Sequence, residues 1–492
     1  MEAARPLRPR TSVHLIIDVG RGERGAMTQE RGGWSELLSG RNGLRSLALA
    51  GGVAVHAINV YMVTTILPSA VRDIGGLAWY AWNMTLFVAA SIFGSAVTPR
   101  LLSGIGARRA LLWAIAIFAA GSAGCAQAPT MPWMLVGRSV QGLGGGLLLG
   151  LSYSCVRLLF EERLWSRAMV FVSSMWGVAT LAGPAIGGIF AQAGYWRGAF
   201  WAMLPISAGL AALVLSQVSA SGRSDQAPAP APFGKIAVLV VTVLLVSVGS
   251  LSPSWKWNLL SILAGCALTV GIARADSRAA RRLLPAGSYA RGSALASLYA
   301  CIALLSIGVC TEIYIPYFLQ AIHGQSPLLA GYWMVLMSAG WTAGSFMSSG
   351  RPKPRADGMM LLGPWLSAAG LLALGLMMPR GPGGAIVWAM VVPLFVVGVG
   401  IGLCWPNMLT RIFKAAPVGQ ENIASAAITT LQLYAIALGS SLAGLVANLA
   451  GLAEPGGEEG ARQAAFALFL VFAMAPAAAG LMSGGARRAR GA

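Results

Sequence analysis

Long apolar segments, repeated along nearly the whole chain, are the feature that most constrains how this sequence can fold. The hydrocarbon core of a membrane offers no partners for backbone polar groups, so an apolar run of about 20 residues has to cross it as a helix. Fourteen such runs cover residues 46–70, 79–97, 109–127, 132–156, 167–191, 197–217, 235–252, 257–273, 293–320, 328–348, 358–378, 384–408, 420–449 and 464–482. The sequence therefore predicts an all-α polytopic membrane protein with fourteen transmembrane helices.

The charged residues support a membrane protein and set its expected orientation. Only 10% of the 492 residues are charged, whereas a soluble domain carries roughly 25%. The net charge of +19 does not indicate a nucleic-acid partner, because the basic residues are spread over short segments between the apolar runs. Most of them fall in alternate segments, which predicts an inner (plasma) membrane protein with both termini cytoplasmic.

Two polar segments divide the chain. Residues 218–234 are rich in Ser, Ala and Pro, which is typical of a linker, and residues 274–292 are basic. The predicted organisation is a cytoplasmic N-terminal tail (1–45), a six-helix bundle (46–217), a linker (218–234), two additional transmembrane helices (235–273), a basic cytoplasmic linker (274–292), a second six-helix bundle (293–482) and a cytoplasmic tail (483–492). We expect the two bundles to face each other across a central site.

The two bundles also resemble each other in sequence. Phe93-Gly-Ser is followed fifteen residues later by Leu111-Leu112, and Ala343-Gly-Ser is followed at the same spacing by Leu361-Leu362. Each pair joins the second and third helix of its bundle through a basic loop. This placement favours parallel repeats arranged around a shared centre.

Several motifs occur in order at particular helices. They are Arg138-Ser-Val-Gln141-Gly142-Leu-Gly144-Gly145-Gly146, the series Gly177, Gly183, Pro184, Gly187 and Gly188, the tripeptide Tyr195-Trp196-Arg197, and Tyr317-Phe-Leu-Gln320 with Gly324 and Ser326. Over residues 46–482 the chain resembles the fourteen-helix drug:proton antiporter branch of the major facilitator superfamily. The resemblance implies export of amphipathic organic compounds or drugs by proton antiport and alternating access, with the glycine series as the antiporter motif.

The glycine series has a physical reading of its own. Glycines at 183, 187 and 188 let a neighbouring backbone approach closely, and Pro184 removes a helical hydrogen bond and favours a bend. A bent and closely packed helix of this kind is suited to control the side of the membrane on which a cavity opens. The alternative is ordinary packing of small residues in a glycine-rich membrane protein.

The sequence departs from the family pattern at two positions. In the predicted cytoplasmic gate loop, which contains Arg100, Ser103, Gly106, Arg108 and Arg109, Ser103 stands where the family has an acid. In the first helix Asn59 stands where the branch has an aspartate. Because of these two neutral residues, the alternative of a transporter that does not use protons, or that is coupled to them differently, stays open.

Glu312 is the one acidic residue deep inside a predicted span, and Arg138 lies at about the same depth, roughly 10 Å from the outer surface. Placing an ionisable group inside a bilayer costs free energy, so each such residue is a candidate for a functional role. We therefore expect Glu312 and Arg138 to meet across the bundles and to couple transport to protons. A static ion pair, or a glutamate facing a water-filled funnel, is the alternative. His56 is a third candidate, although an intramembrane histidine is also compatible with simple packing.

Polar and aromatic side chains in the spans are candidates for the substrate cavity. They are Asn59, Tyr61, Trp82, Gln141, Tyr314 and Trp341. Aromatic faces suit flat lipophilic compounds and cations. The alternative for the Trp and Tyr residues is anchoring at the membrane interface.

Enzymatic function classes are poorly supported. Three scattered histidines and one buried acid do not form the cluster that membrane enzyme chemistry needs, and no phosphate-binding loop is present. Six cysteines without metal-binding spacing predict no metal or other cofactor. The expected partners are the lipid bilayer, a small organic substrate and protons. We expect a monomer and leave open both a periplasmic adaptor and a non-transporting membrane sensor.

Overall fold

The computed structural model describes residues 33–219, 232–252, 254–290, 292–381 and 384–488. The predicted N-terminal tail before residue 33, most of the linker at 218–234 and the last residues of the predicted C-terminal tail lie outside this range.

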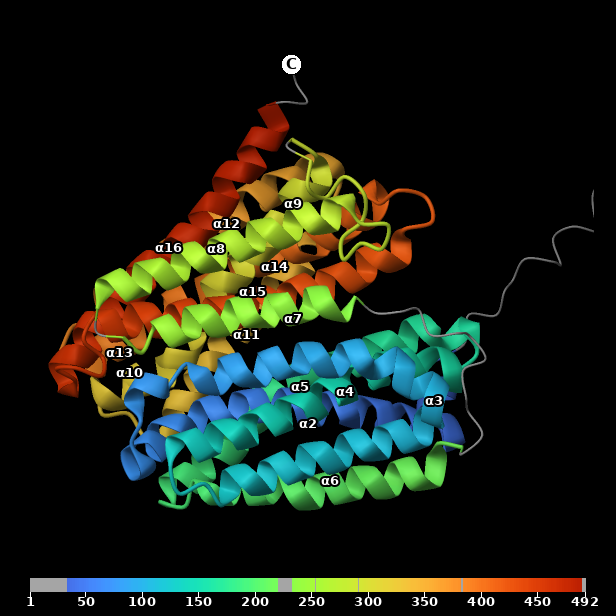
Figure 1. Cartoon of the computed structure of the whole chain (residues 1–492), viewed down its shortest axis with the longest axis horizontal. Coiled ribbons are helices and arrows are strands. Elements are labelled where there is room, and N and C mark those ends of the chain that lie inside the picture. Colours follow the sequence, from blue (N-terminus) through green and yellow to red (C-terminus); the bar gives the residue numbers. More distant parts are fainter. Residues whose placement is uncertain (1–32, 220–231, 253, 291, 382–383, 489–492) are drawn as a thin grey trace, which may run out of the picture.

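Helices and 3₁₀ turns are the regular secondary structure of the described residues, and the architecture is all-α (Figure 1). The elements are α1 (Trp34–Leu38), α2 (Gly40–Ile74), η1 (Leu77–Trp79), α3 (Trp82–Ala126), α4 (Met131–Leu159), α5 (Glu162–Gln192), α6 (Arg197–Gln217), α7 (Phe233–Gly249), α8 (Trp255–Arg278), α9 (Ala294–Val309), η2 (Cys310–Tyr314), α10 (Ile315–Ala321), α11 (Pro327–Ser348), α12 (Lys353–Met377), α13 (Gly384–Ala389), α14 (Val391–Ala415), α15 (Glu421–Leu449) and α16 (Gly457–Arg488). An all-helical chain is what the apolar runs predict.

Membrane-crossing length is reached by many of these helices. Within the described residues, 11 helical segments are long and apolar enough to cross a membrane. One of them, Leu77–Ala126, has 50 residues and covers two of the predicted spans. The 17-residue α7 and the 22-residue α11 fall outside the set of 11. The chain is a multi-pass membrane protein, and the number fourteen stays a prediction.

The predicted gate loop between the second and third spans is helical, which corrects the sequence interpretation. Helix α3 continues through Pro99 and is broken at Gly106, whose φ of 80° is accessible to glycine without strain. On either side of this break the two arms of α3 pack against α4. A Cβ added at Gly142 would lie 2.2 Å from the carbonyl oxygen of Phe87, and one at Gly144 would lie 2.4 Å from the amide nitrogen of Phe118. The glycines of α4 therefore allow both arms to contact its backbone.

Two packed sets of helices make up the molecule. Helices α2–α6 pack against one another, as do α9, α11, α12 and α14–α16. Helices α5 and α11, α2 and α11, and α3 and α15 form most of the contacts between the sets, and α7 lies along this interface with α8 beside it (Figure 1). The domain boundaries given above stay predictions.

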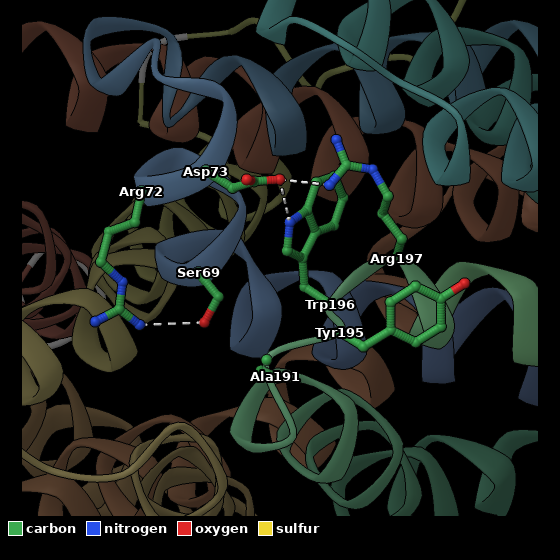
Figure 2. Close-up of a pocket in the computed structure, with 8 residues that line it drawn as sticks. Ser69, Arg72, Asp73, Ala191, Tyr195, Trp196 and Arg197 are labelled. Atoms are coloured by element: carbon green, nitrogen blue, oxygen red, sulfur yellow. Dashed lines mark hydrogen bonds and ion pairs between the residues drawn. The ribbon is translucent and has the colours of Figure 1, made fainter.

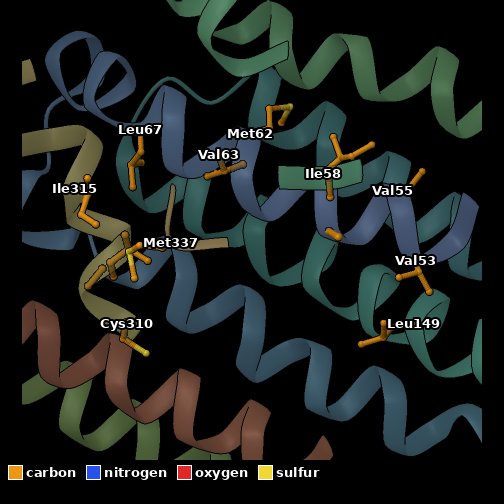
Figure 3. Close-up of a cluster of buried hydrophobic side chains, with 14 of the residues drawn as sticks. Val53, Val55, Ile58, Met62, Val63, Leu67, Leu149, Cys310, Ile315 and Met337 are labelled. Carbon is orange, nitrogen blue, oxygen red and sulfur yellow. The ribbon is translucent and has the colours of Figure 1, made fainter. Parts of the chain in front are cut away.

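Helix α2 lies at the centre of the buried apolar core. Its side chains Ile58, Val63 and Leu67 are buried, and the same cluster contains Leu149 of α4 and Ile315 of α10 (Figure 3). Each of these side chains is at most 9% exposed. Helix α2 therefore packs on residues of both sets.

The predicted span 293–320 is interrupted. Helix α9 ends at Val309, the 3₁₀ turn η2 covers Cys310–Tyr314, and α10 follows. Interrupted helices in membrane proteins occur where the backbone lines a site or is covered by protein. Glu312 lies in this turn, which sequence periodicity does not indicate.

Candidate transport site

Arg138 is the centre of a buried polar network in the first set of helices. Its side chain on α4 is 1% exposed. One terminal nitrogen, Nη1, donates to Asn59 Oδ1 on α2 at 2.6 Å and to Gln141 Oε1 at 2.5 Å, while Nε donates to the backbone oxygen of Asn83 on α3 at 3.2 Å. Gln141 in turn donates to Ser122 Oγ at 2.8 Å. Neutral dipoles from three helices thus solvate this buried cation.

Aromatic rings complete the surroundings of Arg138. The guanidinium carbon lies 4.2 Å from the centroid of the Phe87 ring, within the range of a cation–π contact. His56 packs on the same ring at 5.2 Å and on Trp176 at 5.9 Å. Its Nδ1 atom is buried and has no hydrogen-bond partner among the described residues. His56 is therefore close to the network but is held by ring packing.

The expected ion pair between Arg138 and Glu312 is not formed in this structure. The three hydrogen bonds that Arg138 donates all go to neutral partners of its own set, and the ion pairs within the described residues do not include Glu312. Arg138 is buried and Glu312 half-buried, and their equal depth in the membrane stays a prediction. Depth alone did not give the direction in which each helix turns its side chain.

Glu312 lies at the interface between the two sets without a partner. It is half-buried in η2, and no hydrogen bond or ion pair joins it to another described residue. Tyr314 of the same turn stacks on Tyr80 of the opposite set, which places η2 where the two sets meet. An unpaired carboxylate with partial access is able to exchange a proton or to bind a cation.

The predicted cavity residues occupy three different environments. Asn59 and Gln141 are 0% exposed and hold Arg138, so in this conformation they do not face a cavity. Tyr314 is stacked on Tyr80 at 4.9 Å between ring centroids. Trp82, with its buried Nε1 unpartnered among the described residues, packs on Trp79. Tyr61 and Trp341 are half-buried, and Trp341 contacts Trp405 edge-on at 5.2 Å.

The glycines of the antiporter motif contact two different helices. Cβ atoms added at Gly183 and Gly187 would lie 2.5 Å from Tyr61 Cβ and 2.7 Å from the carbonyl oxygen of Met62, both on α2. A Cβ at Gly188 would lie 2.5 Å from the Cα of Leu328 at the start of α11. Pro184 lies between them, and α5 continues through it as one helix. The motif therefore fits α5 against its own set on one side and against the opposite set on the other.

Gly177 differs from the other motif glycines and supplies a control for them. A Cβ at Gly177 would meet no atom within 4 Å. We expect Gly183→Leu to prevent the close contact with α2, to cost about 1–3 kcal/mol of stability through overpacking, and to stop transport. Gly177→Leu should leave both unchanged. Transport in vesicles together with the thermal unfolding midpoint of both variants measures the difference, and normal transport by Gly183→Leu would contradict a packing role.

The basic residues near Gly106 have no acidic partner among the described residues. Arg109 is exposed and Arg108 half-buried, and Ser103 Oγ donates to the carbonyl oxygen of Arg100 at 3.1 Å. The Arg100 guanidinium carbon lies 4.2 Å from the centroid of the Phe233 ring at the start of α7. The serine that replaces the family's acid thus stays within its own helix.

The corresponding region of the second set does contain an ion pair, which sequence reasoning missed. Asp357 near the start of α12 pairs with Arg411 of α14. The alignment of the two repeats could have indicated it, because Asp357 follows the basic segment between the aligned Gly-Ser and Leu-Leu positions.

A second missed residue is Asp73, in the last turn of α2. Its carboxylate pairs with Arg197 and accepts a hydrogen bond from Trp196 Nε1 at 3.1 Å (Figure 2). Arg72, the preceding residue, points away from this pair toward Ser69. These side chains line an open pocket of about 370 Å³ between the end of α2 and the turn that precedes α6. The tripeptide at 195–197 therefore anchors α6 to α2.

Close contacts between the two sets gather at one end of the molecule. We name it the η1 end, where α2 and α15 finish and η1 and α10 lie. Here Arg72 Nη2 donates to Gln320 Oε1 at 3.2 Å, in addition to the Tyr80–Tyr314 stack and the contact between Gly188 and Leu328. By the charge distribution this end is the predicted exterior face. The rings and backbone contacts close it in this conformation.

Comparisons with known proteins identify the architecture. Residues 49–440 match the sequence model of the Major Facilitator Superfamily. The chain belongs to this superfamily. It is 36% identical over 457 residues to a probable multidrug-efflux transporter of Mycobacterium tuberculosis, covering 91% of this chain and 95% of the relative. It is also similar to the tetracenomycin C resistance and export protein of Streptomyces glaucescens, with 26% identity over 417 residues and coverage of 82% and 75%.

Solved structures of other major facilitator proteins share the fold. A peptide transporter of the POT family superposes with a TM-score of 0.64 at 16% identity, covering 92% of this chain and 97% of that one. The inward-open xylose transporter XylE from E. coli gives 0.58 at 14% identity, with coverage of 89% and 94%. The superfamily match and the relatives named as transporters indicate that this major facilitator protein is a membrane transporter rather than an enzyme.

Proposed function

We propose that this transporter exports amphipathic organic compounds or drugs across the inner membrane in exchange for protons. The relatives named as multidrug-efflux and export proteins support the class of substrate. Alternating access is the mechanism we propose, with one set of helices rocking against the other around the interface that contains Glu312. The proposed topology has both termini in the cytoplasm.

The surroundings of Glu312 are the observation that best supports proton coupling. Among the described residues it is an intramembrane carboxylate with no ion-pair or hydrogen-bond partner, and it lies where the two sets meet. A change in the distance between the sets alters its solvation, and a carboxylate that loses water favours its neutral, protonated form. Rocking would then load and release a proton at this position.

The surroundings of Arg138 support a different role for that residue. Since Asn59 stands where the branch has an acid, both side-chain acceptors of Arg138, Asn59 and Gln141, are amides that do not titrate. We propose that Arg138 keeps its charge throughout the cycle and fixes α2, α3 and α4 relative to one another. His56, packed between Phe87 and Trp176, is the weaker proton candidate.

A second candidate function is transport without protons, or with another coupling ion. The neutral residues Asn59 and Ser103 favour it, because neither supplies the charge that the family pattern has at its position. In that case Glu312 would serve as a counter-charge for a cationic substrate.

Inverted membrane vesicles containing the protein test the choice. We expect a panel of dyes to be transported into vesicles energised with an acidic interior, each active dye to dissipate the pH gradient, and an uncoupler to stop accumulation. Vesicles from cells without the protein provide the background. If dye still accumulates in the presence of the uncoupler, the protein exports its substrates without proton antiport. If no compound accumulates, the alternative of a non-transporting membrane sensor is favoured.

A further inference from the structure

Helix α7 lies between the two sets of helices and contacts both. It packs on α3 of the first set and on α15 of the second, and Figure 1 shows it along their interface. Ser247 of α7 shares a 2.6 Å hydrogen bond with Ser441 of α15, and Ser441 lies 3.5 Å from Thr85 Oγ1 of α3. Small hydroxyl contacts of this kind are individually weak in membranes, at about 0.6 kcal/mol, so they permit sliding.

At the η1 end one side chain joins all three elements. Asn448, in the last turn of α15, donates from Nδ2 to the carbonyl oxygen of Ala78 in η1 at 2.9 Å and to that of Ser250, which directly follows α7, at 3.0 Å. Both hydrogens of the amide are thereby used. The Oδ1 atom is buried and has no partner among the described residues.

Packing one turn earlier on α15 brings the same three elements together. A Cβ added at Gly444 would lie 2.8 Å from Ala81 Cβ and 3.9 Å from both Ser250 Oγ and Tyr314 Oη. Gly444 and Asn448 are four residues apart and so share a face of the helix. The close approach at Gly444 sets the distance at which the Asn448 amide reaches two carbonyl oxygens.

We infer that Asn448 is a positioning residue for closure of the η1 end, and that it makes α7 part of this gate instead of a passive spacer. The inference rests on the alternating-access part of the proposed function. When the sets separate at this end, Ala78 and Asn448 move apart, and the hydrogen bond between them is lost. The bond to Ala78 therefore favours the closed conformation, and the bond to Ser250 holds the end of α7 against α15 beside it.

A cysteine-labelling experiment tests this role. In a variant whose six native cysteines are replaced, Thr64→Cys places a thiol on α2 at a position that is 5% exposed and whose hydroxyl bonds only within its helix. Membrane-impermeant maleimide is applied to intact cells, which reports the predicted exterior face, and to inverted vesicles, which reports the other face. Neither substrate nor a proton gradient is needed, so the result is independent of whether proton antiport holds.

We expect Asn448→Leu to raise the labelling rate in cells about threefold, which corresponds to the loss of the one hydrogen bond between the sets at about 0.6 kcal/mol, and to leave the rate in vesicles equal or lower. Asn258→Leu is the matched control, because that asparagine also has a buried, unpartnered Oδ1, but its Nδ2 bonds only to the nearby Ser252 carbonyl oxygen. It should leave both rates unchanged.

Two outcomes would overturn the inference. Unchanged labelling in cells would show that Asn448 does not hold the end closed. Equal increases on both faces would indicate general loosening of the fold. As a second variant, Asn448→Asp keeps the shape and removes donors, so it should increase labelling in cells as Asn448→Leu does; wild-type labelling by both variants would reject the role.

Discussion

Replacing Glu312 by glutamine is expected to reduce proton-coupled export to the background of vesicles without the protein. The change keeps the size and hydrogen-bonding ability of the side chain and removes its ability to titrate. Glu312 pairs with no cationic side chain among the described residues, so replacing it by glutamine breaks no ion pair there. The protein should therefore reach the membrane in normal amounts and show a normal thermal unfolding midpoint. Substrate-driven loss of the pH gradient in inverted vesicles measures the effect.

Substrate exchange separates loss of coupling from loss of transport. Glu312→Gln should still exchange labelled for unlabelled substrate across the membrane, since this reaction needs no net proton movement. Glu421→Gln, at an exposed position in the first turn of α15, is the matched control and should behave as wild type. Full proton-coupled export by Glu312→Gln would exclude this residue as the proton carrier, and His56 would then be the next candidate.

The sequence was sufficient to predict the helical membrane fold for a simple physical reason. The cost of unpaired backbone groups in lipid leaves few alternatives to a helix for each apolar run. The connection at residues 98–108, which contains Pro99, Ser103 and arginines, was predicted as a loop because it lies between two apolar runs, whereas it is helical on both sides of Gly106. At a membrane surface these residues remain compatible with helix, and the single residue with a left-handed conformation, Gly106, is enough to turn the chain.

The site could be predicted by residue type but not by pairing. Burial cost singles out Arg138 and Glu312, and depth along a helix follows from counting residues. Which side chains meet depends on the rotation of each helix about its axis and on the break at η2, and neither is encoded in a local pattern. Asn59 illustrates the difference: the family pattern identifies it as a missing acid, whereas its structural role is to accept a hydrogen bond from Arg138.

Removing Arg138 should have the largest effect on folding of any single substitution at the site. Arg138→Ala leaves Asn59 Oδ1, Gln141 Oε1 and the Asn83 carbonyl oxygen without their donor in a region sealed from water. Each unsatisfied acceptor costs about 1–3 kcal/mol, so we expect a loss of about 3 kcal/mol or more. The unfolding midpoint of the detergent-solubilised protein should fall strongly and transport should be absent.

Two further variants distinguish the charge of Arg138 from its volume. Arg138→Met keeps much of the bulk and removes every donor, so it should be nearly as unstable as Arg138→Ala if hydrogen bonding to the three acceptors dominates. Arg138→Lys keeps the charge as a point and cannot reach all three acceptors with the geometry of a guanidinium, which predicts intermediate stability. Arg109→Ala, at an exposed position, serves as the control and should keep the stability of the wild type. If Arg138→Met instead matched wild type in stability and transport, the network would be dispensable, and the contacts between α2, α3 and α4 would have to depend on their glycine-rich packing alone.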